Sequence, residues 1–374
     1  MGVRLLRAHE AHVDLPGRRN AAGGVSPAAP LRWTLAGALA VAGATGCAQD
    51  GATLVEQFNN AVARHHLERG ERLASRQRSD EALAEFDAAL QRNPKLAAAH
   101  AQIGRIRNSR GELAQAARHF AEALRLDPLD GLTAFALGQI YQLMSSNPAE
   151  RRDKLRLAAR AYLHACELMP GHFDAHLALG VVYHQLGELD QAVHYYRQSL
   201  RIDPRNTYAM ANLGAAYDSV GKYYEAVNVY KAALEQGGNE PMLLVNLATT
   251  LIRQTRFEAA LEVLQRAIAV DPNLGLAHQR AGYCLAKLGR FSEALAAYGR
   301  GLELNPRSAE AHAGRGMVFM AMYLRNPSYP QLKTAALEHW HRSMELDSNQ
   351  PRLRTLLARY APPQHPGQDL VLGQ

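Results

Sequence analysis

A 34-residue period is the feature of this sequence that most restricts its fold. Residues 173–206 and 207–240 are two consecutive units of this length, with the same kinds of residue at the same places. The shared places are seven and eight (Leu179-Gly180, Leu213-Gly214), eleven (Tyr183, Tyr217), fifteen (Gly187, Gly221), twenty (Ala192, Ala226) and twenty-four (Tyr196, Tyr230). A fixed period in this range indicates an array of stacked supersecondary units.

Each unit is predicted to form two amphipathic helices of about three turns, because its apolar residues recur at helical spacing. Gly187 and Gly221 stand where the first helix has to end, in a left-handed conformation that suits glycine. Asp203-Pro204 predicts the end of the second helix, since proline disfavours helical geometry in the residue before it. Small residues at places eight and twenty let the two helices approach, and the tyrosines fill the gap.

This series of Leu-Gly, Tyr, Ala, Tyr and Pro resembles the signature of the tetratricopeptide repeat family. The resemblance implies an all-α fold, a right-handed superhelical solenoid of helix-turn-helix repeats that bury their apolar faces against each other. The pattern predicts eight repeats in residues 63–348. Their bounds are 63–96, 97–130, 131–172, 173–206, 207–240, 241–274, 275–308 and 309–348.

The segments around the repeats have their own predicted roles. Residues 47–62 are expected to hold a short tether and a leading helix that runs into the first repeat. Residues 349–360 carry one apolar stripe and are expected to form a helix that caps the last repeat. Residues 361–374 are expected to be a disordered tail.

Residues 1–46 have the pattern of an export leader, in which basic residues precede the apolar run 33–45. Ala44-Thr45-Gly46-Cys47 resembles a bacterial lipobox, which implies lipidation of Cys47 and a membrane-anchored lipoprotein facing the periplasm. Ala42-Gly43-Ala44 is an alternative cleavage site that would release a soluble exported protein. An uncleaved leader is the third possibility. No apolar run reaches the ~18 residues expected of a membrane-spanning helix.

In two repeats, 131–172 and 309–348, eight extra residues precede the alanine of place twenty, Ala158 and Ala336. In the first, Asn147, Pro148 and Glu150 suggest an N-cap, an N1 proline and an N3 glutamate. This start would lengthen the second helix by about two turns. The extra residues are interpreted either as a basic docking ridge or as a tolerated solvated insertion.

Composition and motifs do not support catalysis, a cofactor or a small-molecule substrate. The formal net charge is +7, with no Arg/Lys stripe, so a nucleic-acid partner is not expected. The glycines recur once per repeat and never form a phosphate-binding loop.

The sixteen histidines do not predict a metal site. Five of them stand at the fourth place of a repeat, where a packing role is expected, and stacked repeats would hold them apart. These are His66, His100, His176, His278 and His312. Cys166 and Cys284 are expected to be buried small hydrophobic residues that are too far apart to pair.

The resemblance places the candidate site on the inner row, which we define as places 2, 5, 6, 9 and 12 of the first helices. Asn212 and Asn246 resemble the asparagine ladder with which some family members hold an extended peptide backbone, because an amide offers both a donor and an acceptor. The other expected groove residues are apolar: Leu132, Phe135, Leu177, Val181, Tyr208, Met242, Val245, Tyr283 and Met317. The alternative is that the apolar residues of this row only pack against one another.

The function expected from these features is that of a non-catalytic scaffold for protein–protein interaction. It would hold a peptide segment of an envelope assembly in its groove, as the fold-level resemblance to envelope-assembly lipoproteins with these repeats implies. The alternative is a regulatory or adaptor subunit of an envelope enzyme such as a peptidoglycan hydrolase.

Overall fold

The computed structural model describes residues 48–237 and 239–361, and those residues form seventeen α-helices and no strand. The predicted all-α repeat fold is confirmed. The expected leader (1–46), the lipidation site Cys47 and residues 362–374 of the expected tail lie outside the described residues. No helix within 48–237 and 239–361 combines the length and the apolarity needed to cross a membrane.

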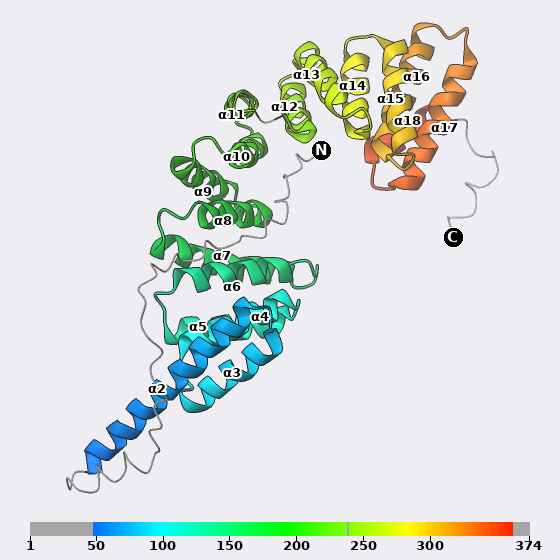
Figure 1. Cartoon of the computed structure of the whole chain (residues 1–374). Coiled ribbons are helices and arrows are strands. Elements are labelled where there is room, and N and C mark those ends of the chain that lie inside the picture. Colours follow the sequence, from blue (N-terminus) through cyan, green and yellow to red (C-terminus); the bar gives the residue numbers. More distant parts are fainter. Residues whose placement is uncertain (1–47, 238, 362–374) are drawn as a thin grey trace, which may run out of the picture. The chain divides into compact units, whose positions relative to one another are not determined.

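The described residues form two compact units, the N-terminal unit (48–202) and the C-terminal unit (203–361). The N-terminal unit is a series of antiparallel helix pairs (Figure 1). Its helices are α2 (Ala48–Ser75), α3 (Ser79–Arg92), α4 (Ala97–Ser109), α5 (Leu113–Leu126), α6 (Gly131–Met144), α7 (Arg151–Leu168), α8 (Phe173–Leu186) and α9 (Leu189–Ile202).

The C-terminal unit continues the same pairing and ends with a single helix (Figure 1). Its helices are α10 (Thr207–Ser219), α11 (Tyr223–Glu235), α12 (Pro241–Arg253), α13 (Phe257–Val270), α14 (Gly275–Lys287), α15 (Phe291–Leu304), α16 (Ala309–Arg325), α17 (Pro330–Leu346) and α18 (Pro351–Tyr360). In α18, Leu353 is buried against Trp340, so this helix covers the apolar face of α17.

The two helices of a pair approach closely because glycine faces a buried aromatic ring. A Cβ added to Gly180 would lie 2.7 Å from the Tyr196 ring, and one added to Gly214 would lie 2.6 Å from the Tyr230 ring. Both tyrosines are fully buried. The structure therefore shows the predicted packing of a small residue on one helix against a large ring on its partner helix.

The turn between paired helices requires a left-handed residue. Gly187 and Gly221 hold φ at 82° and 79°. In the first and sixth repeats the same place holds Gln77 and Thr255, with φ at 62° and 60°. These two turns keep the glycine conformation without glycine, at a cost of roughly 1 kcal/mol or more each.

Two details of the sequence prediction are wrong. No tether separates residue 47 from the first repeat, because α2 is already helical at Ala48 and continues without a break to Ser75. The helix expected to begin at Pro148 begins at Arg151 instead. The Asn147 side chain accepts a hydrogen bond from the backbone N–H of Ala149 (3.2 Å), which makes a local turn and not a helix cap. Helix α7 is thus four residues longer than α9, about one turn and not two.

Candidate functional site

A hollow of about 420 Å³ lies in the C-terminal unit along the first helices of the sixth, seventh and eighth repeats, α12, α14 and α16. Its volume is in the range of ligand-binding pockets. The α12 residues on its wall are Met242, Val245, Asn246 and Thr249. The α14 helix and its N-cap residue contribute Leu274, Gly275, Leu276, Gln279 and Arg280. The end of α15, the turn after it and the start of α16 contribute Gly301, Leu304, Asn305, Arg307, Ser308 and Glu310.

Three of the expected groove residues, Met242, Val245 and Asn246, line this hollow together. Val245 is only 1 % exposed, so it forms part of the hydrophobic core as well as the wall. Tyr283 is not on the wall; its ring packs edge-on against Phe257 with the centroids 6.2 Å apart. Met317 is 49 % exposed on α16, outside the wall.

The two asparagines of the inner row are both buried, Asn212 on α10 and Asn246 on α12. The Nδ2 atom of Asn212 has no hydrogen-bond partner among the described residues. A buried donor without an acceptor costs about 1–3 kcal/mol. Asn212 does not line the hollow. Asn246 adds its amide to the wall of the hollow.

A buried polar network joins α10 to α12. Asp218 is fully buried and accepts a hydrogen bond from the Thr250 hydroxyl at 2.9 Å. The Arg253 guanidinium lies 2.9 Å from the other carboxylate oxygen. Burial raises the pKa of Asp218, while Thr250 and Arg253 lower it. This network could not be predicted from the repeat signature, because nothing in that signature requires an acid at place twelve.

Arg280 stands at the sixth place of the seventh repeat, where the asparagine row is interrupted, and its side chain borders the hollow. It is 8 % exposed, and burial lowers the pKa of its guanidinium, against the opposing effect of nearby Glu310. A cation with little access to water favours an anionic partner. Glu310, which acts on Arg280, lines the same hollow, so the charged groups of the wall are Arg280, Arg307 and one carboxylate, a balance of one positive charge.

The expected groove residues of the N-terminal unit are apolar and lie on α6 and α8. Leu132 is 42 % exposed on α6, and Leu177 and Val181 are half-buried on α8. Phe135 packs against the rings of Tyr162 and His172, with centroids 5.5 and 5.0 Å away. In the C-terminal unit, Tyr208 is half-buried at the start of α10.

The recurring histidine at place four is a hydrogen-bonding residue of the fold. The Nε2 atoms of His176, His278 and His312 lie 3.0, 3.0 and 3.2 Å from the carbonyl oxygens of Pro170, Pro272 and Pro306. Each of these prolines lies just after the preceding helix, so the histidine ties one repeat to the next. Within the residues that the structure describes, no group of three or more His, Cys, Asp or Glu side chains could hold a metal ion.

Cys166 and Cys284 are both buried free thiols. Burial raises the pKa of each to about 12, so neither thiolate is populated near neutral pH. Both therefore act as small packing residues.

Comparison with known protein families decides the identity of the repeats. Tetratricopeptide repeat families match residues 67–131, 173–206, 219–281 and 251–318, which together cover more than half of the chain. The chain is a tetratricopeptide repeat protein. This fold supports a protein partner as the ligand.

Two curated relatives share the repeats of this tetratricopeptide repeat protein. The general transcriptional corepressor ssn6 of Schizosaccharomyces pombe is 29 % identical over 209 residues, which are 51 % of this chain and 18 % of the relative. The general transcriptional corepressor trfA of Dictyostelium discoideum is 29 % identical over 126 residues, 33 % of this chain and 8 % of the relative. The chain thus spans less than a fifth of the length of either protein.

Two solved structures show the same fold. A tetratricopeptide repeat protein from Parabacteroides merdae superposes with a TM-score of 0.53 at 18 % identity, over 70 % of this chain and 97 % of that chain. A chain of the APC/C hetero-tetramer Cut9–Hcn1 gives a TM-score of 0.51 at 19 % identity, over 75 % of this chain and 52 % of that chain. At these identities the likeness concerns the fold alone.

Proposed function

We propose that this tetratricopeptide repeat protein is a non-catalytic scaffold that binds an extended peptide of a partner protein in the hollow of its C-terminal unit. The observation that carries the proposal is the hollow itself, with an asparagine amide and a buried arginine on a wall that also holds Met242 and Leu276. Polar groups at fixed points beside apolar side chains are typical of a recognition site.

The expected binding mode follows from the chemistry of the wall. The peptide backbone would pair with the amide of Asn246 on the wall. Where the peptide continues beyond the hollow along the inner row, it would reach Asn212, one repeat earlier on α10. Apolar side chains of the peptide would contact Met242 and Leu276, and an acidic side chain would reach Arg280. Specificity would then require an apolar and an acidic residue at a set spacing in the partner.

The combined change Asn212→Ala with Asn246→Ala is expected to weaken peptide binding at least ~10-fold, since each lost amide leaves a desolvated peptide group unpaired. The measurement is the affinity for the partner segment recovered by crosslinking, with the melting temperature recorded beside it. Asn212→Ala alone should leave stability nearly unchanged, because its Nδ2 atom has no partner to lose.

His278→Ala is the matched control for this experiment. His278 is half-buried on α14 but is not on the wall of the hollow, and its imidazole bonds the Pro272 carbonyl oxygen. The change should lower stability and leave affinity within about twofold. Unchanged affinity of the asparagine variant, or unfolding of its C-terminal unit, would contradict the proposed groove.

We further propose that the scaffold is exported and anchored to a membrane on the periplasmic side through Cys47. The support is the lipobox-like sequence that ends at Cys47, directly before the first described helix. In this setting the partner would belong to an envelope assembly. A membrane pull-down that recovers one peptidoglycan hydrolase, and no set of structural components, would instead favour the regulatory-subunit function.

Cys47→Ala is expected to move the protein from the membrane pellet to the soluble fraction. The reason is that stable attachment by lipid requires more than one acyl chain, and Cys47 is the residue that would carry the chains. Fractionation with a high-salt wash measures the effect. If the variant stays in the washed pellet, the lipid-anchor proposal fails.

A further inference from the structure

The seventh and tenth places of a repeat pack against the second helix of the repeat before it. In the second repeat these places hold Ile103 and Ile106, which are buried in one cluster with Phe86 of α3. In the third repeat they hold Leu137 and Ile140, which are buried against α5. Apolar residues at these two places are therefore the surface on which one repeat receives the preceding helix.

The first repeat has arginine at both of these places, Arg69 and Arg72. They stand on α2, which no other helix of the described residues precedes. Together with Arg76 and Arg78 they form what we call the arginine face, and with Leu73 at their centre they line a hollow of about 570 Å³ between α2 and α3. The first repeat of the described residues is thus cationic at the two places where every later repeat of the unit is apolar.

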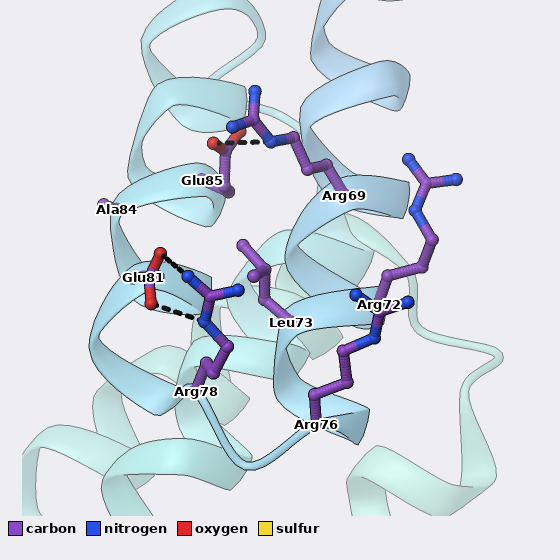
Figure 2. Close-up of a pocket in the computed structure, with 8 residues that line it drawn as sticks. All are labelled: Arg69, Arg72, Leu73, Arg76, Arg78, Glu81, Ala84 and Glu85. Carbon is purple, nitrogen blue, oxygen red and sulfur yellow. Dashed lines mark hydrogen bonds and ion pairs between the residues drawn. The ribbon is translucent and has the colours of Figure 1, made fainter.

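Half of this positive charge is already neutralised by carboxylates of α3. Arg78 donates to both carboxylate oxygens of Glu81 (2.6 Å each), and Arg69 lies 3.2 Å from Glu85. Figure 2 shows these two pairs, while Arg72 and Arg76 extend from α2 away from both glutamates. Within the described part of the chain neither Arg72 nor Arg76 has an ion pair, so the face keeps two uncompensated positive charges.

We propose that the arginine face is a second binding surface, separate from the peptide groove, on which an acidic helix of a partner protein docks. The helix would take the place that a preceding second helix takes in the later repeats. Arg72 and Arg76 are four residues apart on one helical face, so they would meet carboxylates spaced at i and i+4 on the partner. A planar guanidinium can donate two parallel hydrogen bonds to the two oxygens of a carboxylate, as Arg78 does to Glu81.

Neither the last described helix nor residues 1–46 have the composition of this acidic helix. Its terminal helix α18 carries Arg352, Arg354 and Arg359 and no acidic residue, so head-to-tail stacking of two copies would bring like charges together. Residues 1–46 hold five arginines against Glu10 and Asp14. A polar terminal repeat is sufficient for solubility, and uncharged residues would serve that need equally well.

The test compares two arginine pairs of equal spacing in the full-length protein. Arg72→Gln with Arg76→Gln removes the free charge of the face. Arg197→Gln with Arg201→Gln is the matched control, because these two residues are also exposed and four apart, on α9 of the same unit. The probe is a fluorescent helical peptide with glutamate at successive i and i+4 positions, beside its glutamine counterpart, at ~50 mM salt.

The acidic peptide is expected to bind the wild-type protein, and the glutamine peptide is not. The Arg72/Arg76 variant should bind the acidic peptide about tenfold more weakly, and the Arg197/Arg201 variant within about twofold of wild type. Equal losses in the two variants would overturn the proposal, because the attraction would then be diffuse. Binding of phosphatidylglycerol vesicles or of a single-stranded oligonucleotide in preference to the acidic peptide would also overturn it, in favour of a phosphate-bearing surface.

Discussion

Tyr230→Ala is expected to lower the free energy of unfolding of the C-terminal unit by about 3–5 kcal/mol. The Tyr230 ring is fully buried in the largest core cluster of the unit, and it fills the gap left by Gly214 on the facing helix. Removing the ring leaves a cavity that the helix pair cannot close without shifting α10 against α11. Urea denaturation followed by circular dichroism measures the effect, and a loss below ~1 kcal/mol would contradict this packing.

Tyr230→Phe separates the ring from its hydroxyl. The Tyr230 hydroxyl is buried and has no hydrogen-bond partner among the described residues, and burial raises its pKa. Removing an unpaired buried hydroxyl should leave stability unchanged or raise it by up to about 1 kcal/mol. The equivalent places in the first two repeats already hold phenylalanine, Phe86 and Phe120.

Gly316→Ala is expected to destabilise the last helix pair by about 2–3 kcal/mol. A Cβ at residue 316 would lie 2.5 Å from the Trp340 ring and 2.9 Å from the carbonyl oxygen of Ala336. Trp340 is fully buried and the carbonyl belongs to the α17 backbone, so neither can move away cheaply. The clash exceeds the gain of up to about 1 kcal/mol that alanine brings to a helix. The melting temperature of the variant measures the balance.

Gly299→Ala is the control, since Gly299 also lies inside a helix of the same unit. A Cβ there would meet no atom within 4 Å, so only the higher helix propensity of alanine changes the stability. This variant should be more stable than wild type by about 0.5–1 kcal/mol. Opposite signs for the two glycines are the expected result, and equal signs would refute the contact with Trp340 as the cause.

The repeat period predicts most of the fold because it ties each residue to a fixed packing role. Gly180 with Tyr196, and Gly187 at the turn, have the same roles in the structure as in the sequence analysis. The start of α7 could not be predicted in the same way. Asn147 can cap a helix or close a turn with its own backbone, and the packing of the insertion decides between these two conformations.

The candidate site is predicted less completely than the fold. The family pattern identifies Asn212 and Asn246 because they recur at one place, but it says nothing of their burial. Arg280 appears in the sequence only as an interruption of the asparagine row. Its low exposure and its place on the hollow arise from the stacking of α14 between α12 and α16, which is a tertiary property.

Photocrosslinking from Met242 tests the central claim of a peptide groove most directly. A photoreactive residue at position 242 faces the hollow, whereas one at Glu262 is exposed on α13, the second helix of the same repeat. If the peptide binds in the hollow, position 242 gives adducts with one segment of one partner, and position 262 gives none. The combined change Asn212→Ala with Asn246→Ala then reduces the adducts at position 242. Equal labelling from both positions, or none at position 242 while the partner still copurifies, would contradict it.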